Sequence, residues 1–274
     1  MFEGAPEQGA QVVGADANGN RQRRLTSGPH MGEMPRWGPF GRRILYLRST
    51  TDGRRDLMVM GPRGRDKHQL LYGRDRFITD MAWGPRGGRV ALVMSPRRTA
   101  NFADIYMFSL ETRKLTRLHV NSFPSRDPAS LDWSRDGKTI AFSAVDYTED
   151  DDDFEDHDLY LIRPDGTGLR QITNTSPLDE LNPRFSPDGS QLAYSRAPWD
   201  GPGSVMIAAA DGTNPRRLPT GRGTAHQGSW SPDGGQLLVE KYDRQGAEVI
   251  WRMTSAGTDR RFLMHGRNAS WRPR

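Results

Sequence analysis

The sequence predicts an all-β protein, a single six-bladed β-propeller of four-stranded antiparallel blades that spans residues 1–274. Three observations predict this fold. A motif of an aromatic residue, a small residue and a tight turn recurs along the chain. Each repeat also contains four short strand signals, the number found in one propeller blade. Finally, 30 glycines, 19 prolines and a hydrophobic fraction of 34% are typical of many short strands joined by turns.

The motif begins at six aromatic positions: Trp37, Trp83, Trp133, Phe185, Trp230 and Trp271. Successive aromatic residues lie 41 to 52 residues apart, which fits the period of one propeller blade. The Ser-Pro-Asp-Gly that follows Phe185 and Trp230 matches a type I turn, because proline presets φ at the second position and glycine suits the fourth. Recurrence in every blade indicates packing and turn formation, so we do not assign the motif residues to a site.

Each repeat continues with an apolar second strand, a third strand and a basic fourth strand. In the third repeat these are residues 140–142, 158–162 and 169–173, with a glycine turn at 165–166. The five complete blades are expected at residues 34–71, 80–118, 130–173, 182–218 and 227–263.

The two ends of the chain are expected to form the sixth blade together. Residues 1–3 resemble a second strand, 11–13 a third strand and 21–26 a fourth strand. The missing first strand is expected at 268–271, so the sixth blade is split between residues 1–26 and 268–274. Such closure would leave no free sheet edge.

The stretch from Leu131 to Gly234 resembles the WD40-like repeats of the TolB family. It carries the aromatic-Ser-Pro-Asp-Gly turn, an apolar triplet, Asp-Leu-Tyr-Leu-Ile and Asp-Gly-Thr-Gly-Leu-Arg-Gln-Ile-Thr. The resemblance covers essentially the whole chain and implies an extracytoplasmic setting, periplasmic or secreted. TolB itself also has an N-terminal α/β domain, for which this chain has no room. The repeats also resemble the propellers of prolyl-oligopeptidase-like peptidases, but no hydrolase domain follows and no Gly-x-Ser-x-Gly motif occurs.

Composition excludes several function classes. The absence of cysteine excludes disulfides, thiolate zinc sites and cysteine nucleophiles. No run approaches the roughly 18 apolar residues of a membrane helix, and the first ten residues show no export signal. The net charge of +5 would suit a nucleic acid, but the arginines are scattered and many fall on fourth strands. Charges on exposed strands block sheet association, so we expect no nucleic-acid partner.

Two groups of residues are candidate metal ligands. An acidic insert at 146–156, with Asp151 and Asp153, has the oxygen donors that Ca²⁺ prefers, although such charge runs are usually just solvated. His30, His226 and Glu33 lie on the same predicted loop face, where imidazole and carboxylate groups could bind Zn²⁺ or Mn²⁺. Loops are also where polar residues ordinarily lie, so both interpretations stay open. No cofactor is certain.

The candidate binding residues lie on that same face. One group lies three or four residues before the blade aromatics, and symmetry would place it around the channel mouth: Glu33, Asp80, Asn182, His226, Gln227, Arg267 and Asn268. A second group lies in loops between second and third strands: Tyr147, Trp199 and Tyr242. An exposed tryptophan there suits stacking on a sugar or anchoring a peptide, and folding back onto its own blade is the alternative.

The leading functional hypothesis is a non-enzymatic, monomeric binding scaffold. Its partner, a protein or a small-molecule or saccharide ligand, would dock on the face of the blade-to-blade loops and at the channel mouth. The alternative is a metal-assisted lyase or hydrolase acting on a saccharide or small molecule, with His30, His226 and Glu33 in its site. A stoichiometrically bound metal would favour the enzyme.

Overall fold

The computed structural model describes residues 2–4, 9–96, 103–118, 126–146, 156–198, 200–221, 223–243 and 245–273. The chain forms two compact units, the first with residues 1–78 and 219–274 and the second with residues 79–218. Every regular element in the described ranges is a β-strand, which confirms the all-β prediction. Within these ranges there is no helix with the length and apolar character needed to cross a membrane.

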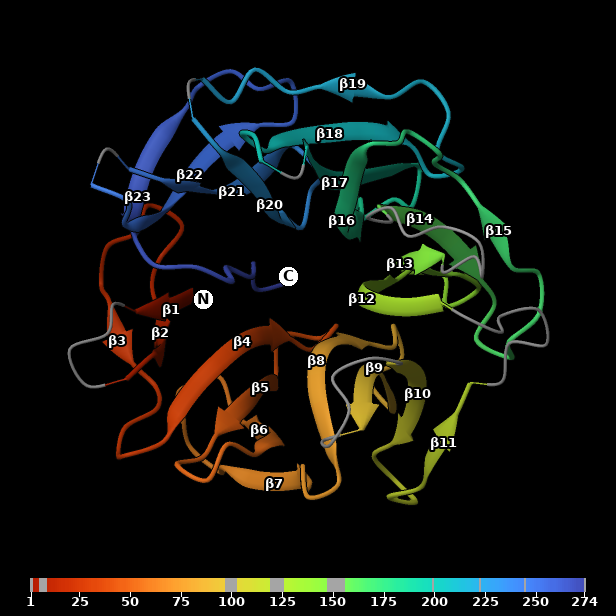
Figure 1. Cartoon of the computed structure of the whole chain (residues 1–274). Helices are drawn as coiled ribbons and strands as arrows, with labels where there is room; N and C mark the ends of the chain where they lie inside the picture. Colours follow the sequence, from red (N-terminus) through yellow and green to blue (C-terminus); the bar gives the residue numbers. More distant parts are fainter. Residues whose placement is uncertain are drawn as a thin grey trace. The chain divides into compact units, whose positions relative to one another are not determined.

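The second unit contains three four-stranded antiparallel blades (Figure 1). In each blade the strands are hydrogen-bonded in chain order, so the blade is a simple meander. The first blade has β8 (Arg76–Trp83, which starts just before the unit boundary), β9 (Arg89–Pro96), β10 (Asp104–Ser109) and β11 (Leu115–Arg117). The next has β12 (Arg126–Trp133), β13 (Ile140–Asp146), β14 (His157–Ile162) and β15 (Arg170–Gln171). The last has β16 (Leu178–Phe185), β17 (Gln191–Pro198), β18 (Ser204–Ala209) and β19 (Arg216–Arg217).

The first unit contains two four-stranded blades and a three-stranded sheet. One blade has β4 (Met31–Trp37), β5 (Ile44–Ser49), β6 (Arg55–Met60) and β7 (His68–Leu71). The other has β20 (Ala225–Trp230), β21 (Gln236–Tyr242), β22 (Glu248–Thr254) and β23 (Arg261–His265). The three-stranded sheet has β1 (Phe2–Gly4), β2 (Gln11–Gly14) and β3 (Arg23–Arg24).

The prediction of six blades is wrong, because the described part of the structure has five four-stranded blades. Residues 268–271, expected as the missing first strand, form no strand. Side chains of the blade β20–β23 accept hydrogen bonds from the backbone of this segment. The Ala269 N–H donates to Glu240 Oε1 at 3.0 Å, and the Trp271 N–H donates to Ser229 Oγ at 3.1 Å. No ladder in the described ranges pairs these residues with β1, which is the outermost strand of its three-stranded sheet. The C-terminal segment is therefore held in place without becoming a fourth strand.

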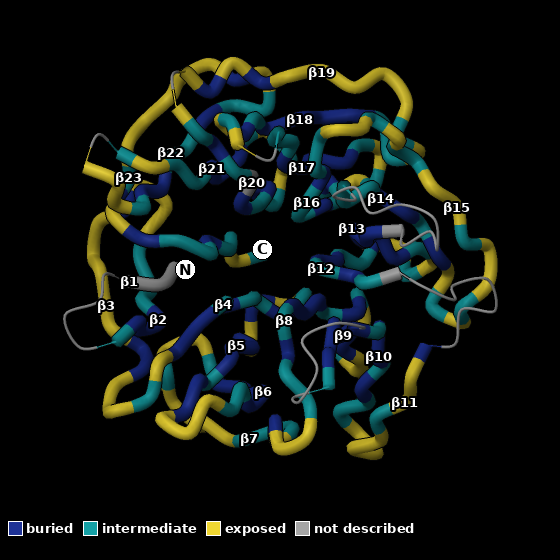
Figure 2. Tube along the Cα trace, viewed as in Figure 1, coloured by how far each residue is buried: buried dark blue, intermediate teal, exposed yellow. Residues whose placement is uncertain are grey.

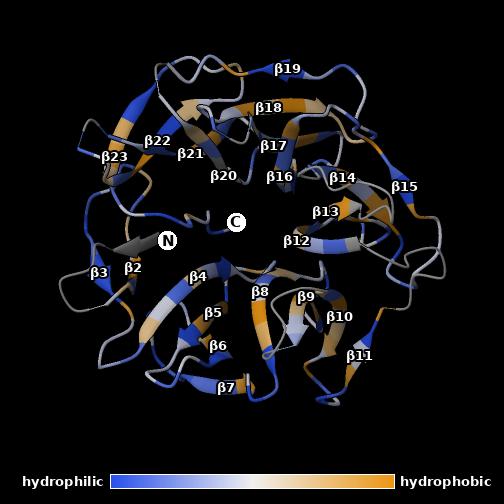
Figure 3. Cartoon of the chain, in the orientation of Figure 1, coloured by the Kyte–Doolittle hydropathy of each residue, from blue (hydrophilic) through white to orange (hydrophobic). Residues whose placement is uncertain are grey.

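The middle strands of the blades are apolar on both faces. On β13, Ile140 and Phe142 pack with residues of β9 and β10, while Ala141 between them packs with Tyr194 of β17. Because successive side chains of a strand point to opposite faces, a strand buried on both faces has a continuous apolar sequence. Figure 2 shows the fourth strands β15 and β19 as exposed, and Figure 3 shows β18 as hydrophobic.

The Ser-Pro-Asp-Gly turn is closed by its own residues. In the turn between β16 and β17, the Gly189 N–H donates to the Ser186 carbonyl oxygen at 2.9 Å. The Ser186 hydroxyl donates to Asp188 Oδ1 at 2.5 Å and accepts the Gln191 N–H at 2.9 Å. Gly189 has φ +75°, a conformation that glycine adopts without steric cost. The motif residues that dominate the sequence thus have a structural role.

A second glycine turn, between the third and fourth strands, lies against the preceding blade. A Cβ atom on Gly212 would lie 2.6 Å from the carbonyl oxygen of Ile172, and one on Gly19 would lie 2.7 Å from that of Leu263. Both glycines have positive φ, +90° and +80°. Conformation and close backbone approach therefore both require glycine at these two positions.

Candidate functional site

Four strand ends meet at one edge of the blade β20–β23. The pairs Ala225–Lys241, Tyr242–Glu248 and Val249–His265 are direct partners in the antiparallel ladders, so these ends lie side by side. This edge carries six polar or aromatic side chains. We call them the polar end of β20–β23: His226, Tyr242, Asp243, Glu248, His265 and Arg267.

An exposed aromatic ring lies at the polar end. The rings of His226 and Tyr242 make an edge-to-face contact, with centroids 6.1 Å apart and an interplanar angle of 86°. Tyr242 is 47% exposed, whereas His226 is half-buried. Burial lowers the pKa of His226, and the negative charge of Glu248 partly opposes this. Burial thus favours the neutral imidazole, which packs against the phenol ring.

Two charge pairs flank these rings. Arg267 Nη1 lies 3.5 Å from Glu248 Oε2, and His265 Nε2 lies 3.6 Å from Asp243 Oδ2. The hydrogen bond from the Ala247 N–H, at 2.9 Å, is the main reason why the pKa of Asp243 is lowered. All four side chains are partly exposed to solvent, so a partner could reach them.

The aromatic surface continues along β22 and β23. Phe262 is 49% exposed and makes edge-to-face contacts with Trp251 at 6.1 Å and with His265 at 5.6 Å. The Lys241 ammonium group lies 5.8 Å from the Trp251 ring. Exposed aromatic residues gathered beside charged groups are typical of interaction sites.

A buried carboxyl pair lies in the second unit, at β14 and β16. Glu180 is fully buried, and its Oε1 accepts a hydrogen bond from Arg196 Nε at 2.8 Å. Asp158 accepts hydrogen bonds from Gln171 at 2.8 Å and Thr173 at 3.2 Å. Burial, followed by the neighbouring charge of Glu180, raises the pKa of Asp158 to about 6. The Asp158 carboxyl group therefore keeps its proton to a higher pH than an exposed aspartate does.

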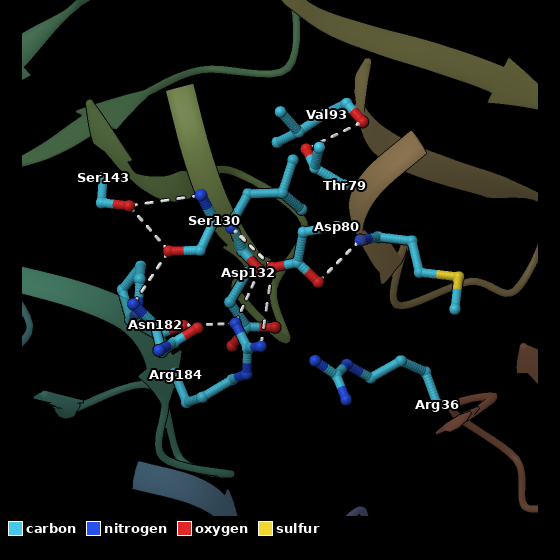
Figure 4. A network of polar contacts seen from close by, with 12 residues as sticks. Arg36, Thr79, Asp80, Val93, Ser130, Asp132, Ser143, Asn182 and Arg184 are labelled. Carbon is cyan, nitrogen blue, oxygen red and sulfur yellow. Dashed lines mark hydrogen bonds and ion pairs between the residues drawn. The ribbon is translucent and has the colours of Figure 1, made fainter. Parts of the chain in front are cut away.

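Buried polar groups also link the first strands of the second unit (Figure 4). Asp80 on β8 is 2% exposed, and its carboxylate accepts the N–H groups of Met81 at 2.8 Å and Leu131 at 3.0 Å. Arg184 on β16 lies 3.6 Å from this carboxylate and donates to the Leu131 carbonyl oxygen at 2.7 Å. Asp80 therefore holds together the backbones of neighbouring blades.

One hydrogen bond of this kind recurs in both units. The backbone N–H of a motif aromatic donates to the side chain that lies one residue before the preceding motif aromatic. The three pairs are Phe185 with Asp132 at 2.8 Å, Trp271 with Ser229 at 3.1 Å and Trp37 with Ser270 at 3.3 Å. The C-terminal segment thus makes the same link as a regular first strand, although it is not one.

The repeats and blades have clear counterparts among known proteins. No protein-family profile matches the chain. A protein TolB homolog of Chlorobium luteolum is 27% identical over 176 residues, which cover 63% of this chain and 36% of that relative. The crystal structure of TolB from Acinetobacter baumannii matches all of this chain and 66% of that chain, with a TM-score of 0.79 and 18% identity. A putative TolB from Agrobacterium tumefaciens matches 92% of this chain and 90% of its own, with a TM-score of 0.73 and 18% identity.

The chain has a β-propeller fold similar to that of TolB and resembles TolB homologs in sequence, and we refer to it as a TolB-type propeller for this likeness. It spans only about a third of the length of the TolB homologs that it matches in sequence. The likeness to the solved structures shows only the fold of the propeller. Its activity and partners have to be inferred from the residues of this chain.

Three predicted binding residues of this TolB-type propeller come together in the structure. His226, Tyr242 and Arg267 all belong to the polar end of β20–β23. The backbone of Gln227 pairs with Val239 on the same blade, and its side chain lies outside the described part. Loop position in the sequence thus identified three of the six residues of the polar end.

The remaining predicted residues have mainly internal contacts. The Glu33 carboxylate is buried, accepts the Ser49 hydroxyl at 2.8 Å and lies 3.4 Å from Arg55 Nε. Asn182 and Asn268 adopt φ values of +56° and +53°, and the backbone N–H of Asn182 donates to Ser130 Oγ at 2.8 Å. The Glu33 carboxylate and the Asn182 backbone are thus engaged in contacts within their own units.

The metal predictions receive no support from the geometry. No three histidine, aspartate or glutamate side chains gather around a common point within the described ranges. His30 accepts a hydrogen bond from Gln11 Nε2 through its carbonyl oxygen, at 3.2 Å. Four predicted residues lie outside the described ranges: Tyr147, Asp151, Asp153 and Trp199. Binding of Ca²⁺, Mn²⁺ or Zn²⁺ therefore stays a prediction.

Sequence reasoning missed Glu248 and the pair Asp158–Glu180. A signal was present, since the third strand of four blades has an acidic residue at its first or second position: Asp56, Asp104, Asp158 and Glu248. Alignment of the repeats at this position would have identified Glu248 as a neighbour of the predicted loop residues. Glu180 has no equivalent repeat signal, because its role depends on contacts between blades.

Proposed function

We propose that this TolB-type propeller is a non-enzymatic binding scaffold whose protein partner docks on the polar end of β20–β23. The TolB-like fold supports a binding scaffold at the level of the family. The observation that carries the proposal for this chain is the exposed Tyr242 ring, supported by His226 and flanked by the Arg267–Glu248 pair. The extracytoplasmic setting implied by the TolB resemblance belongs to the same proposal.

The chemistry of the polar end suits a protein partner. Tyrosine and arginine dominate the binding energy of protein interfaces, because each combines a large contact area with hydrogen-bonding groups. Tyr242 ends a strand that is paired on both sides, so its backbone is fixed before a partner arrives. Fixed contact residues lose little conformational entropy on binding. The polar end thus combines exposed aromatic area with a preformed backbone.

The enzyme hypothesis has weaker support from the described residues. Glu33, its proposed carboxylate, is engaged with Ser49 and Arg55. His226, its proposed imidazole, packs against Tyr242 of its own blade, whereas Glu33 belongs to the blade β4–β7. Metal analysis of the purified protein tests this choice. Stoichiometric Zn²⁺, Mn²⁺ or Ca²⁺ would contradict a purely non-enzymatic scaffold.

Matched variants test the docking surface. Tyr242→Ala and Arg267→Ala remove the two main contact groups, while Phe40→Ala removes a 63% exposed aromatic side chain at a turn of another blade. A genuine partner, purified and titrated against each protein, should bind Tyr242→Ala about 30-fold more weakly, the cost of losing one interface hot spot. Binding to Phe40→Ala should equal that of the wild type. Equal affinity for all of these proteins would refute the proposal.

A further inference from the structure

The first unit contains a cavity of about 580 Å³ that adjoins the turn after β2, strand β3, the blade β20–β23 and the C-terminal segment. Its apolar lining consists of Leu25, Trp37, Leu238, Ile250, Met264 and Trp271. Pockets that bind small molecules have volumes of roughly 300–1,000 Å³ and mostly apolar walls with a few polar groups. The cavity has both properties.

This cavity is distinct from the polar end of β20–β23. The turn Ser231–Asp233, which joins β20 to β21, lines the cavity. The polar end begins where β21 finishes, at Tyr242, which is the opposite end of the same strand. A ligand in the cavity would therefore leave the proposed docking surface free.

Arginines dominate the charged part of the lining. Arg21, Arg23, Arg63 and Arg272 all line the cavity, and all four are exposed. Arg272 stacks over the Trp37 ring at 5.2 Å. The other three have no ion pair with any carboxylate in the described ranges. Their guanidinium groups thus form a basic rim at the cavity.

Two carboxylates in the lining offset part of this positive charge. Asp16 Oδ1 accepts the N–H groups of Asn18 and Asn20, each at 2.9 Å, within its own turn. Asp233 Oδ1 accepts the Ser231 hydroxyl at 2.6 Å and the Gly235 N–H at 3.0 Å. Four arginines against two aspartates leave the lining with an excess of positive charge, which favours an anionic ligand.

One further donor in the lining lacks a partner. Trp271 Nε1 is buried and makes no hydrogen bond with the described residues. A buried donor without an acceptor costs about 1–3 kcal/mol, so native structures usually satisfy such groups.

We propose that the cavity binds a small amphipathic anion, with an aliphatic or aromatic body and one acidic headgroup such as a carboxylate. The apolar lining would enclose the body, and Arg21, Arg23 and Arg63 would bind the headgroup through charge-assisted hydrogen bonds. This inference is independent of the proposed docking function, because it concerns other residues and the opposite end of the strands.

Fluorescence titration of the full chain with 8-anilinonaphthalene-1-sulfonate, followed by competition, tests the proposal. The wild type should bind the probe saturably, and decanoate should displace it far better than decyltrimethylammonium. The double variant Arg23→Gln/Arg63→Gln should bind decanoate about tenfold more weakly, since hydrogen bonds to charged groups contribute that much or more. Ala15→Trp, which fills the cavity from its wall, should abolish binding.

Lys114→Gln is the matched control, because Lys114 lines a separate recess in the second unit. It should bind the probe and decanoate as the wild type does. Three results would overturn the proposal: no saturable binding, equal displacement by the cationic amphiphile, or unchanged affinity in both cavity variants. An equal loss of affinity in Lys114→Gln would assign the binding to the other recess and overturn it as well.

Discussion

Replacement of Asp80 by alanine should strongly destabilise the second unit. The substitution leaves the Leu131 N–H without its acceptor and Arg184, whose side chain is 10% exposed, without its buried counter-charge. Loss of one partner from a buried ion pair costs about 3–5 kcal/mol. An unsatisfied buried donor costs about 1–3 kcal/mol, and the two costs overlap because one carboxylate serves both groups. We expect a loss of about 4 kcal/mol in the free energy of unfolding.

Urea unfolding monitored by tryptophan fluorescence measures this loss. Asp80→Asn provides the matched comparison, because its amide oxygen can still accept the Leu131 N–H while the charge opposite Arg184 is gone. We expect a smaller loss of about 1–3 kcal/mol for this variant. The reasoning would be refuted if the free energies of unfolding of both variants lay within about 1 kcal/mol of the wild-type value. Changes that small are ordinary for surface substitutions.

Two further substitutions test the structural account. Gly212→Ala should destabilise the chain more than Gly189→Ala: both have positive φ, but only at Gly212 does a Cβ collide, 2.6 Å from the Ile172 carbonyl oxygen. Equal midpoints in thermal unfolding would show that this contact is unimportant. For Asp158, a pKa raised from 3.8 to about 6 means that its stabilising contribution is present below pH 4 and lost as pH rises through 6. The stability of Asp158→Asn relative to the wild type should therefore increase from pH 5 to pH 7.5, and the opposite trend would contradict the raised pKa of Asp158.

The blades could be predicted from the sequence because their signals are local. The turn at 186–189 depends only on residues within it, so the motif identifies the turn without knowledge of the fold. The apolar triplet 140–142 belongs to a strand that is buried on both faces, which predicts β13 directly. Local patterns of this kind recur in all five blades.

The sixth blade was mispredicted because its outcome depends on contacts between distant residues. Trp271 repeats the motif aromatic, and its N–H makes the same link as in other repeats. Glu240, however, takes the Ala269 N–H, and this contact spans 29 residues. Burial raises the pKa of Glu240, and these backbone hydrogen bonds oppose the shift. No repeat pattern marks Glu240, so the sequence alone does not show that the C-terminal segment is held by side chains.

The candidate site was predictable in part for the same reason. Loop position led to His226, Tyr242 and Arg267, which do lie together. Loop position also led to Asp80, whose carboxylate proves to bind the backbone of β12. Sequence position indicates the end of the blade on which a residue lies, whereas burial and hydrogen bonding decide whether it faces a partner.

Site-specific photo-crosslinking tests the central claim, that the polar end of β20–β23 is a docking surface, most directly. A benzophenone amino acid replaces Tyr242 in one protein and Phe40 in another, and both are irradiated in the source cells. The proposal predicts one discrete protein adduct from position 242 and none of that mass from position 40. The absence of an adduct at position 242, or the same adducts from both positions, would contradict it.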